Sequence, residues 1–119
     1  MESRPVLPRM RALCLSFPET SERSSWGHPN FRAGQRTFAT FEWVQGRPSM
    51  AFRLTPRDVA RLGRRKHFFT TPYGRGQWIS TWADVRIDWS LIGDLFERSY
   101  RLVALKRMIT ALDSRPDKS

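Results

Sequence analysis

The chain has 119 residues, enough for one hydrophobic core but too few for two ordinary domains, so we expect a single domain over residues 1–113. It contains no run of roughly 20 apolar residues and no signal-peptide pattern, which predicts a soluble, cytoplasmic protein without a membrane partner. Its net charge of +10 favours a polyanionic partner, and nucleic acid is the first to consider.

The first part of the chain predicts one helix followed by β-hairpins. A helix is expected over residues 5–16, where apolar residues recur at three- and four-residue spacing, and Pro18 ends it. From Trp26 the pattern changes to short aromatic runs separated by glycine turns, which is typical of strands joined by hairpins. Two such turns are predicted, within residues 31–36 and 44–48.

A second helix and two further strands follow. Thr55 can accept a hydrogen bond from a helix-starting amide, Pro56 suits the first helical position, and Gly63 can end this helix. Strands are predicted at residues 68–71 and 77–83, joined by a tight glycine-containing connection. The sequence therefore places a short helix between two groups of strands.

The last helix is predicted to begin after Asp88, which can cap it, and its apolar stripe extends to Leu112, with the helix continuous or broken in two. Residues 114–119 carry no apolar side chain and are expected to form a disordered tail. The element order is α-β-β-β-α-β-β-α. Short connections favour antiparallel pairing, so we predict an α+β fold of two layers, with an antiparallel five-stranded sheet and helices on one face.

The positive charge is concentrated in the middle of the chain. Residues 51–86 contain eight basic and two acidic residues, which accounts for +6 of the total charge. Arg57 and Arg61 share one face of the predicted second helix, and a basic run of residues 64–66 follows it. Two other interpretations remain open: these side chains form an ordinary solvated surface, or the 18 arginines reflect a compositional bias of the genome.

Arginine is well suited to nucleic acid because its planar guanidinium matches phosphate and guanine. Several arginines stand beside glycine at the predicted turns, and an exposed tryptophan near them could stack on unpaired bases. Trp78 is the aromatic candidate, since it would share a strand face with Ser80 and Trp82. The predicted nucleic-acid-binding residues are Arg32, Arg36, Arg47, Arg57, Arg61, Arg64, Arg65, Lys66, Arg75, Trp78, Lys106 and Arg107.

The sequence lacks the usual patterns of catalytic and metal sites. His28 and His67 have no second His, Cys or carboxylate at metal-ligand spacing, so no metal site is predicted. Ser24 lies near His28, but no nucleophile elbow or oxyanion loop accompanies it. Cys14 is the only cysteine and is expected to fill the core. We expect no enzymatic activity, no catalytic residue and no cofactor.

Three stretches together resemble the MmcQ/YjbR family of small bacterial proteins. They are SWGHPNFR at 25–32 with the following Gly34 and Phe38-Ala39, FFTTPY at 68–73 leading to Gln77-Trp78-Ile79, and SYRLVALKRM at 99–108. The resemblance covers roughly residues 5–113. It implies a fold like that of type III secretion chaperones, also compared with frataxin-type proteins, and DNA binding through a double-wing arrangement. Leu105 stands where family members often have proline, so here the helix could run through.

The leading hypothesis is a nucleic-acid-binding protein, with DNA as the favoured ligand and mainly non-specific phosphate contacts through arginines. The alternative is a protein or peptide interaction module of the secretion-chaperone-like type, without enzymatic activity. Such a module would use the exposed sheet face or the terminal helix as an apolar contact surface. The sequence predicts no particular oligomeric state.

Overall fold

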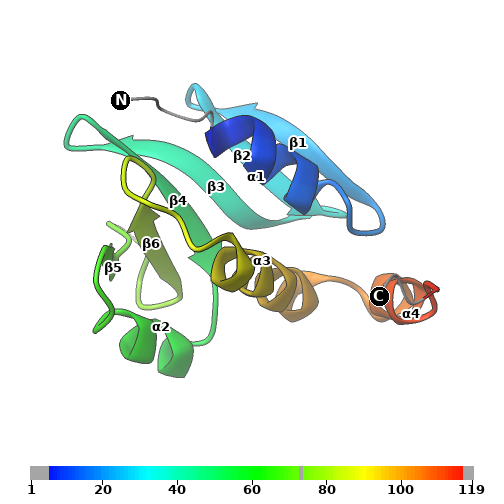
Figure 1. The fold of residues 1–119 in the computed structure, drawn as a ribbon. Helices are drawn as coiled ribbons and strands as arrows, with labels where there is room; N and C mark the ends of the chain where they lie inside the picture. Colours follow the sequence, from blue (N-terminus) through cyan, green and yellow to red (C-terminus); the bar gives the residue numbers. More distant parts are fainter. Residues whose placement is uncertain (1–5, 73, 117–119) are drawn as a thin grey trace.

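A computed structural model describes residues 6–72 and 74–116. Within these residues the chain forms four helices and six strands (Figure 1). In chain order they are α1 Val6–Cys14, β1 Thr20–Ser25, β2 His28–Ala33, β3 Arg36–Val44, β4 Arg47–Arg53, α2 Pro56–Leu62, β5 Phe68–Thr70, β6 Trp78–Trp82, α3 Trp89–Val103 and α4 Lys106–Asp113. No helix in the described part of the chain is long and apolar enough to cross a membrane.

All six strands form one antiparallel sheet in the order β1-β2-β3-β4-β6-β5. The α+β class and the antiparallel sheet are confirmed, but the predicted count of five strands was wrong. Strand β1 was missed because its sequence, TSERSS, has no apolar residue to alternate with polar ones. Pairing with β2 alone makes it a strand, from Thr20 opposite Ala33 to Ser25 opposite His28.

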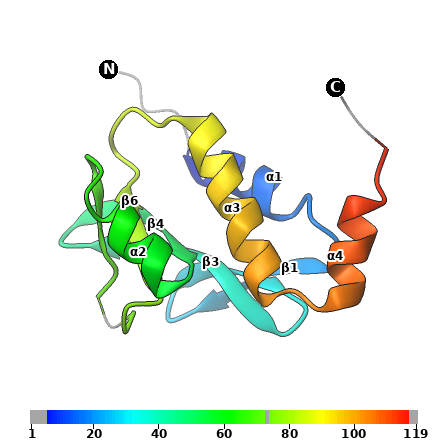
Figure 2. The same cartoon turned by 90° about the horizontal axis from the view of Figure 1, so that it is seen from below.

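Helix α3 packs across β3 and β4 and forms the centre of the core. The rings of Phe96 and Phe52 lie with centroids 5.0 Å apart, and Tyr100 meets Phe38 edge-on at 5.7 Å. The Tyr100 hydroxyl donates a hydrogen bond to the carbonyl of Pro18 at 2.8 Å, which satisfies the polar atom of this buried residue. In Figure 2, α1, α3 and α4 all lie on one side of the strands, which leaves the other side without a helical layer.

A β-bulge lets two consecutive residues of β3 enter the core. Phe31 pairs with Ala39 and Arg32 pairs with Thr37, so Phe38 is the extra residue between them. Phe38 and Ala39 are both fully buried. On a regular strand successive side chains point to opposite faces, so the bulge increases the apolar contact that β3 offers to α3.

The final helix is broken in two. Helix α3 ends at Val103, and Ala104 and Leu105 have extended backbones with ψ of 152° and 156° before α4 begins. Of the two alternatives that the sequence left open, a continuous helix and a helix broken in two, the structure has the second. The amide of Met108 bonds to the carbonyl of Leu105 at 2.9 Å, which starts the new helix directly after the break.

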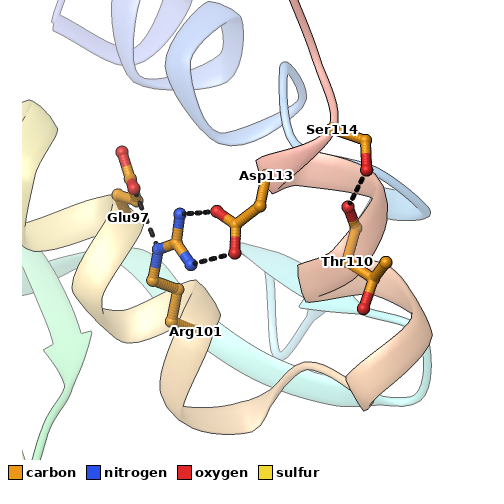
Figure 3. A network of polar contacts seen from close by, with 5 residues as sticks. All are labelled: Glu97, Arg101, Thr110, Asp113 and Ser114. Carbon is orange, nitrogen blue, oxygen red and sulfur yellow. Dashed lines mark hydrogen bonds and ion pairs between the residues drawn. The ribbon is translucent and has the colours of Figure 1, made fainter.

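Ion pairs hold α4 against α3 across this break (Figure 3). The guanidinium of Arg101 donates to Glu97 at 2.9 Å and makes two bonds to Asp113, at 2.6 and 3.3 Å. Beyond α4, the Ser114 hydroxyl bonds to the Thr110 carbonyl at 2.8 Å. Arg115, within the predicted tail, donates to the carbonyl of Ser16 at 2.6 Å, while residues 117–119 lie outside the described part.

Three turns place a non-glycine residue and then a glycine at positive φ: Trp26–Gly27, Gln45–Gly46 and Arg75–Gly76. Two consecutive positive φ values are the mark of type I′ turns, whose twist matches that of the flanking strands. For a residue with a side chain this conformation costs about 1 kcal/mol. The turns therefore combine a favourable hairpin geometry with local backbone strain.

Cys14 provides a test of the packing between α1 and the sheet. Its side chain is fully buried, and desolvation raises the pKa of its thiol. We expect Ellman's reagent to leave the native protein unlabelled at pH 8 and to label one thiol per chain in denaturant. In the control variant Ser21→Cys, which adds a thiol at an exposed position of β1, one thiol should react at once. Rapid labelling of native wild-type protein would contradict the core described here.

Candidate nucleic-acid interface

Basic residues from two loops meet beside the start of α3. Arg65 and Lys66 from the α2–β5 connection and Arg86 from the β6–α3 connection line one cavity of about 300 Å³. All three side chains are exposed, and none forms an ion pair with an acidic residue in the described part of the chain. Together with the neighbouring exposed Arg64, they are called the basic corner below.

Strand pairing explains why these two loops come together. His67 directly precedes β5, and its carbonyl accepts hydrogen bonds from the Trp82 amide at 3.0 Å and the Thr81 hydroxyl at 3.3 Å. Because Trp82 is the last residue of β6, the loop that leads into β5 and the loop that leaves β6 lie at the same end of the sheet. His67 adopts a positive φ of 74°, so the backbone turns sharply just after Lys66.

The basic cavity contains one carboxylate among its lining residues, that of Asp88. One of its oxygens accepts a hydrogen bond from the Leu91 amide at 3.2 Å and caps α3. This is the cap expected from the sequence. The carboxylate keeps its negative charge, but within the described residues it forms no ion pair with Arg65, Lys66 or Arg86.

Arg47 lies near the same end of the sheet but is held by internal contacts. Its guanidinium donates to both carboxylate oxygens of Asp84, at 2.8 and 2.7 Å, and lies 4.0 Å from the ring centroid of Trp82. Trp82 in turn stacks on Phe69 with centroids 4.2 Å apart. The hydrogen bonds to Arg47 lower the pKa of Asp84. A phosphate that bound Arg47 would have to compete with this carboxylate.

The other predicted residues are distributed over several parts of the surface. Arg57 and Arg61 lie on α2, where Arg61 pairs with Asp58, and Lys106 and Arg107 begin α4, where Arg107 pairs with Glu19. The remainder lie toward the end of the sheet opposite Arg47: Arg32 on β2, Arg36 at the start of β3, Arg75 in the β5–β6 connection and Trp78 at the start of β6. The strand from Arg47 to Arg53 spans about 20 Å, so the twelve predicted residues do not form one continuous surface.

The sheet face opposite the helices carries a second cavity. Thr40, Ala51 and Ser80 are neighbours across β3, β4 and β6 on this face, because they alternate with the core-facing Phe52 and Ile79. The cavity has a volume of about 240 Å³ and is lined by Asn30, Thr37, Thr40, Glu42, Thr71, Pro72, Gly74 and Trp78. It is called the outer-face cavity below.

Several residues of the two cavities, Arg86 and Glu42 among them, and the exposed Trp26 outside both were not predicted as site residues. Arg86 was counted only in the charge of residues 51–86, because nothing local in the sequence links it to residues 64–66. Glu42 lies in an aromatic strand segment, and its place in the lining of the outer-face cavity becomes apparent only when the strands are paired in the sheet. Trp26 is 95% exposed at the β1–β2 turn, and the Trp26–Gly27 dipeptide before a strand was a local signal for it.

The histidines and carboxylates are not grouped as metal ligands. Within residues 6–72 and 74–116, no set of three or more His, Cys, Asp or Glu residues is placed to hold a metal ion. His28 lies on β2, where its carbonyl accepts a hydrogen bond from the side-chain amide of Asn30 at 3.1 Å.

Comparison with known proteins gives the family. The YjbR family model matches residues 15–102. The chain belongs to the YjbR family. This YjbR protein contains all three of the stretches on which the resemblance was based, although the third extends beyond the matched range. No curated protein matches the sequence.

Two solved structures resemble this YjbR protein. One is a Pseudomonas syringae protein with a TM-score of 0.70 and 13% sequence identity. The aligned region covers 80% of this chain and 96% of the Pseudomonas chain. The second is a Deinococcus radiodurans protein with a DUF419 domain, with a TM-score of 0.72 and 18% sequence identity. The aligned region covers 95% of this chain and 91% of the Deinococcus chain. At these identities the likeness shows the fold alone.

The Arg47–Asp84 pair predicts a measurable titration. The Asp84 carboxyl should titrate below the ordinary aspartate value of about 3.9, and Arg47→Gln should return it toward that value. A pKa that is lower in the folded than in the unfolded protein stabilises the fold at neutral pH, and this contribution is lost as the pH falls through the folded value. Carbon-detected NMR of the Asp84 carboxyl measures its pKa in the wild type and in Arg47→Gln.

Asp113, which pairs with Arg101, is the control and should titrate low in both proteins. An ordinary Asp84 titration in the wild type would contradict the pair.

Proposed function

We propose that this protein binds nucleic acid, mainly through phosphate contacts at the basic corner. The observation that carries the proposal is the convergence of Arg65, Lys66 and Arg86 on one cavity, where none of them forms an ion pair with an acidic residue of ranges 6–72 and 74–116. Like charges held close together repel each other, and a bound anion relieves this repulsion. Phosphate matches the planar donors of arginine and the point charge of lysine.

The wider charge distribution favours a polyanion over a single small anion. The net charge of +10 attracts nucleic acid from a distance, and further exposed arginines such as Arg57, Arg36 and Arg75 add to this field. Binding of this kind is weakly sequence-specific because phosphates are the same along every strand. The protein then acts as a binding protein, with no catalytic step and no cofactor.

The salt dependence of binding tests this proposal. Duplex DNA should bind tightly at low salt, and the logarithm of the association constant should fall linearly with the logarithm of the salt concentration. The triple variant R65Q/K66Q/R86Q should bind more weakly, and its salt slope should be shallower by about 0.9 for each phosphate that the variant no longer neutralises. Fluorescence anisotropy of a labelled duplex over a salt series measures both quantities.

A matched variant distinguishes the effect of the basic corner on binding from the effect of net charge alone. R23Q/R36Q/K106Q removes the same charge from exposed positions that form no ion pair in the described part of the chain. Its binding should weaken much less than that of the corner variant. Equal losses would contradict the placement at the corner, and a wild-type protein that binds no nucleic acid would contradict the function.

The alternative, a protein interaction module, is favoured by two exposed tryptophans. Trp26 is 95% exposed at the β1–β2 turn, and Trp43 is 60% exposed beside the β3–β4 turn. The register of β2 with β3 places these two turns at the same end of the sheet (Figure 1). Exposed apolar groups of this size are common in protein interfaces.

A pull-down from nuclease-treated lysate distinguishes the two functions. If the protein is an interaction module, protein partners should remain bound after nuclease treatment and should be lost in the variant Trp26→Ser/Trp43→Ser. If it is a nucleic-acid-binding protein, co-purifying material should disappear with the nuclease, and the same double variant should leave DNA binding at the basic corner unchanged.

A further inference from the structure

We infer that the outer-face cavity is a pocket for one unpaired nucleobase that carries an exocyclic amino group. The inference rests on the proposed function, since the base would belong to a single strand whose phosphates are held by nearby arginines. It assigns a role to Glu42 and Asn30, which the phosphate contacts at the basic corner leave unused.

The lining groups of the cavity match the two properties of a nucleobase, a flat aromatic face and a polar edge. Trp78 supplies an indole on which a base can stack. Glu42 can only accept hydrogen bonds when ionised, while Asn30 can both donate and accept. A carboxylate accepts well from the amino group of cytosine, whereas an unpaired thymine or uracil presents it with one N3–H donor flanked by two carbonyl oxygens that repel it.

The fold leaves these groups with unused hydrogen-bonding capacity. Glu42 is half-buried, and its carboxylate accepts one hydrogen bond, a long one of 3.3 Å from the Thr40 hydroxyl, with no ion pair in the described residues. Asn30 uses its amide nitrogen to bond to the His28 carbonyl at 3.1 Å. The Glu42 carboxylate therefore has acceptor capacity left for an amino-bearing ligand.

Arginines stand beside the cavity where the backbone of the same nucleotide would lie. Arg32 lies two residues after Asn30 on the same face of β2 and pairs with Thr37, and its buried Nε has no hydrogen-bond partner among the described residues. Buried polar atoms are rarely left without partners, so this atom also calls for an external acceptor. Arg53 is the register partner of Trp78, which places a second guanidinium next to the proposed stacking surface.

The size of the cavity suits one base. It is an open depression of the sheet surface with a volume of about 240 Å³, which is enough for a single small planar group. A base in a duplex keeps its stacked neighbours and its pairing partner, so only an unpaired base can insert. A free nucleotide has the same chemistry, and the experiment must therefore separate it from a strand.

The test compares labelled oligo(dC) and oligo(dT) of equal length at one fixed salt concentration. Wild-type protein should bind oligo(dC) about five-fold tighter or more, as expected for one well-made base contact. Glu42→Gln should abolish this preference, because an amide can donate to thymine as well as accept from cytosine. The control Asp94→Asn removes one negative charge, as Glu42→Gln does, but from an exposed position of α3. It should leave the preference for oligo(dC) unchanged.

A second pair of variants tests the stacking surface. Trp78→Leu keeps an apolar side chain at the cavity and should weaken binding of both oligonucleotides about ten-fold. Trp26→Leu removes a tryptophan at the far end of the sheet and should have no such effect. Thermal unfolding of each variant checks that the fold is intact, and Glu42→Gln alone decides the question if Trp78→Leu fails to fold.

The possible outcomes separate this inference from the function on which it rests. Equal binding of both oligonucleotides by the wild type, or a preference that survives Glu42→Gln, overturns the base pocket and leaves phosphate binding at the basic corner standing. No binding of either oligonucleotide overturns the base pocket, and it overturns the proposed function as well only if duplex DNA also fails to bind. Deoxycytidine monophosphate that binds as tightly as oligo(dC) would show a free-nucleotide site and overturn the assignment to a strand.

Discussion

The packing of α3 on one face of the sheet determines the organisation of the whole molecule. The contacts of Phe96 with Phe52 and of Tyr100 with Phe38 bury the centre of the sheet from one side. The described helices that cover the core then share this side, and the opposite face carries polar side chains together with the rings of Trp78, Trp82 and Phe69. The outer-face cavity exists because the strands present threonine, asparagine and glutamate to the side that no helix covers.

Local signals in the sequence were sufficient for elements whose ends are fixed by neighbouring residues. Helix α2 begins after Thr55, whose hydroxyl accepts from the Asp58 amide at 3.2 Å, and stops before Gly63, as predicted. The break between α3 and α4 could not be predicted from Leu105, because the Arg101–Asp113 contact that joins the two helices becomes visible only in three dimensions. The same holds for β1, which owes its structure to its partner strand.

The candidate sites show the same limit. The basic run of residues 64–66 was evident from the sequence, but its convergence with Arg86 depends on β5 and β6 being paired at the sheet edge. Charge counting also overestimated the available surface. Arg47, Arg61 and Arg107 each have a carboxylate partner, so these cations are partly neutralised within the molecule. A sequence lists charges, whereas pairing across the fold decides which of them can meet a ligand.

The strained turns have a further consequence for how this protein could change. Trp26, Gln45 and Arg75 occupy backbone conformations that glycine or asparagine would adopt more easily. Substitution by glycine at these positions would relax the main chain and at the same time remove an indole, an amide or a guanidinium group from the surface. Thermostability and surface chemistry are therefore opposed at the hairpin tips, and a variant selected only for heat resistance would tend to lose the side chains that reach furthest into the solvent.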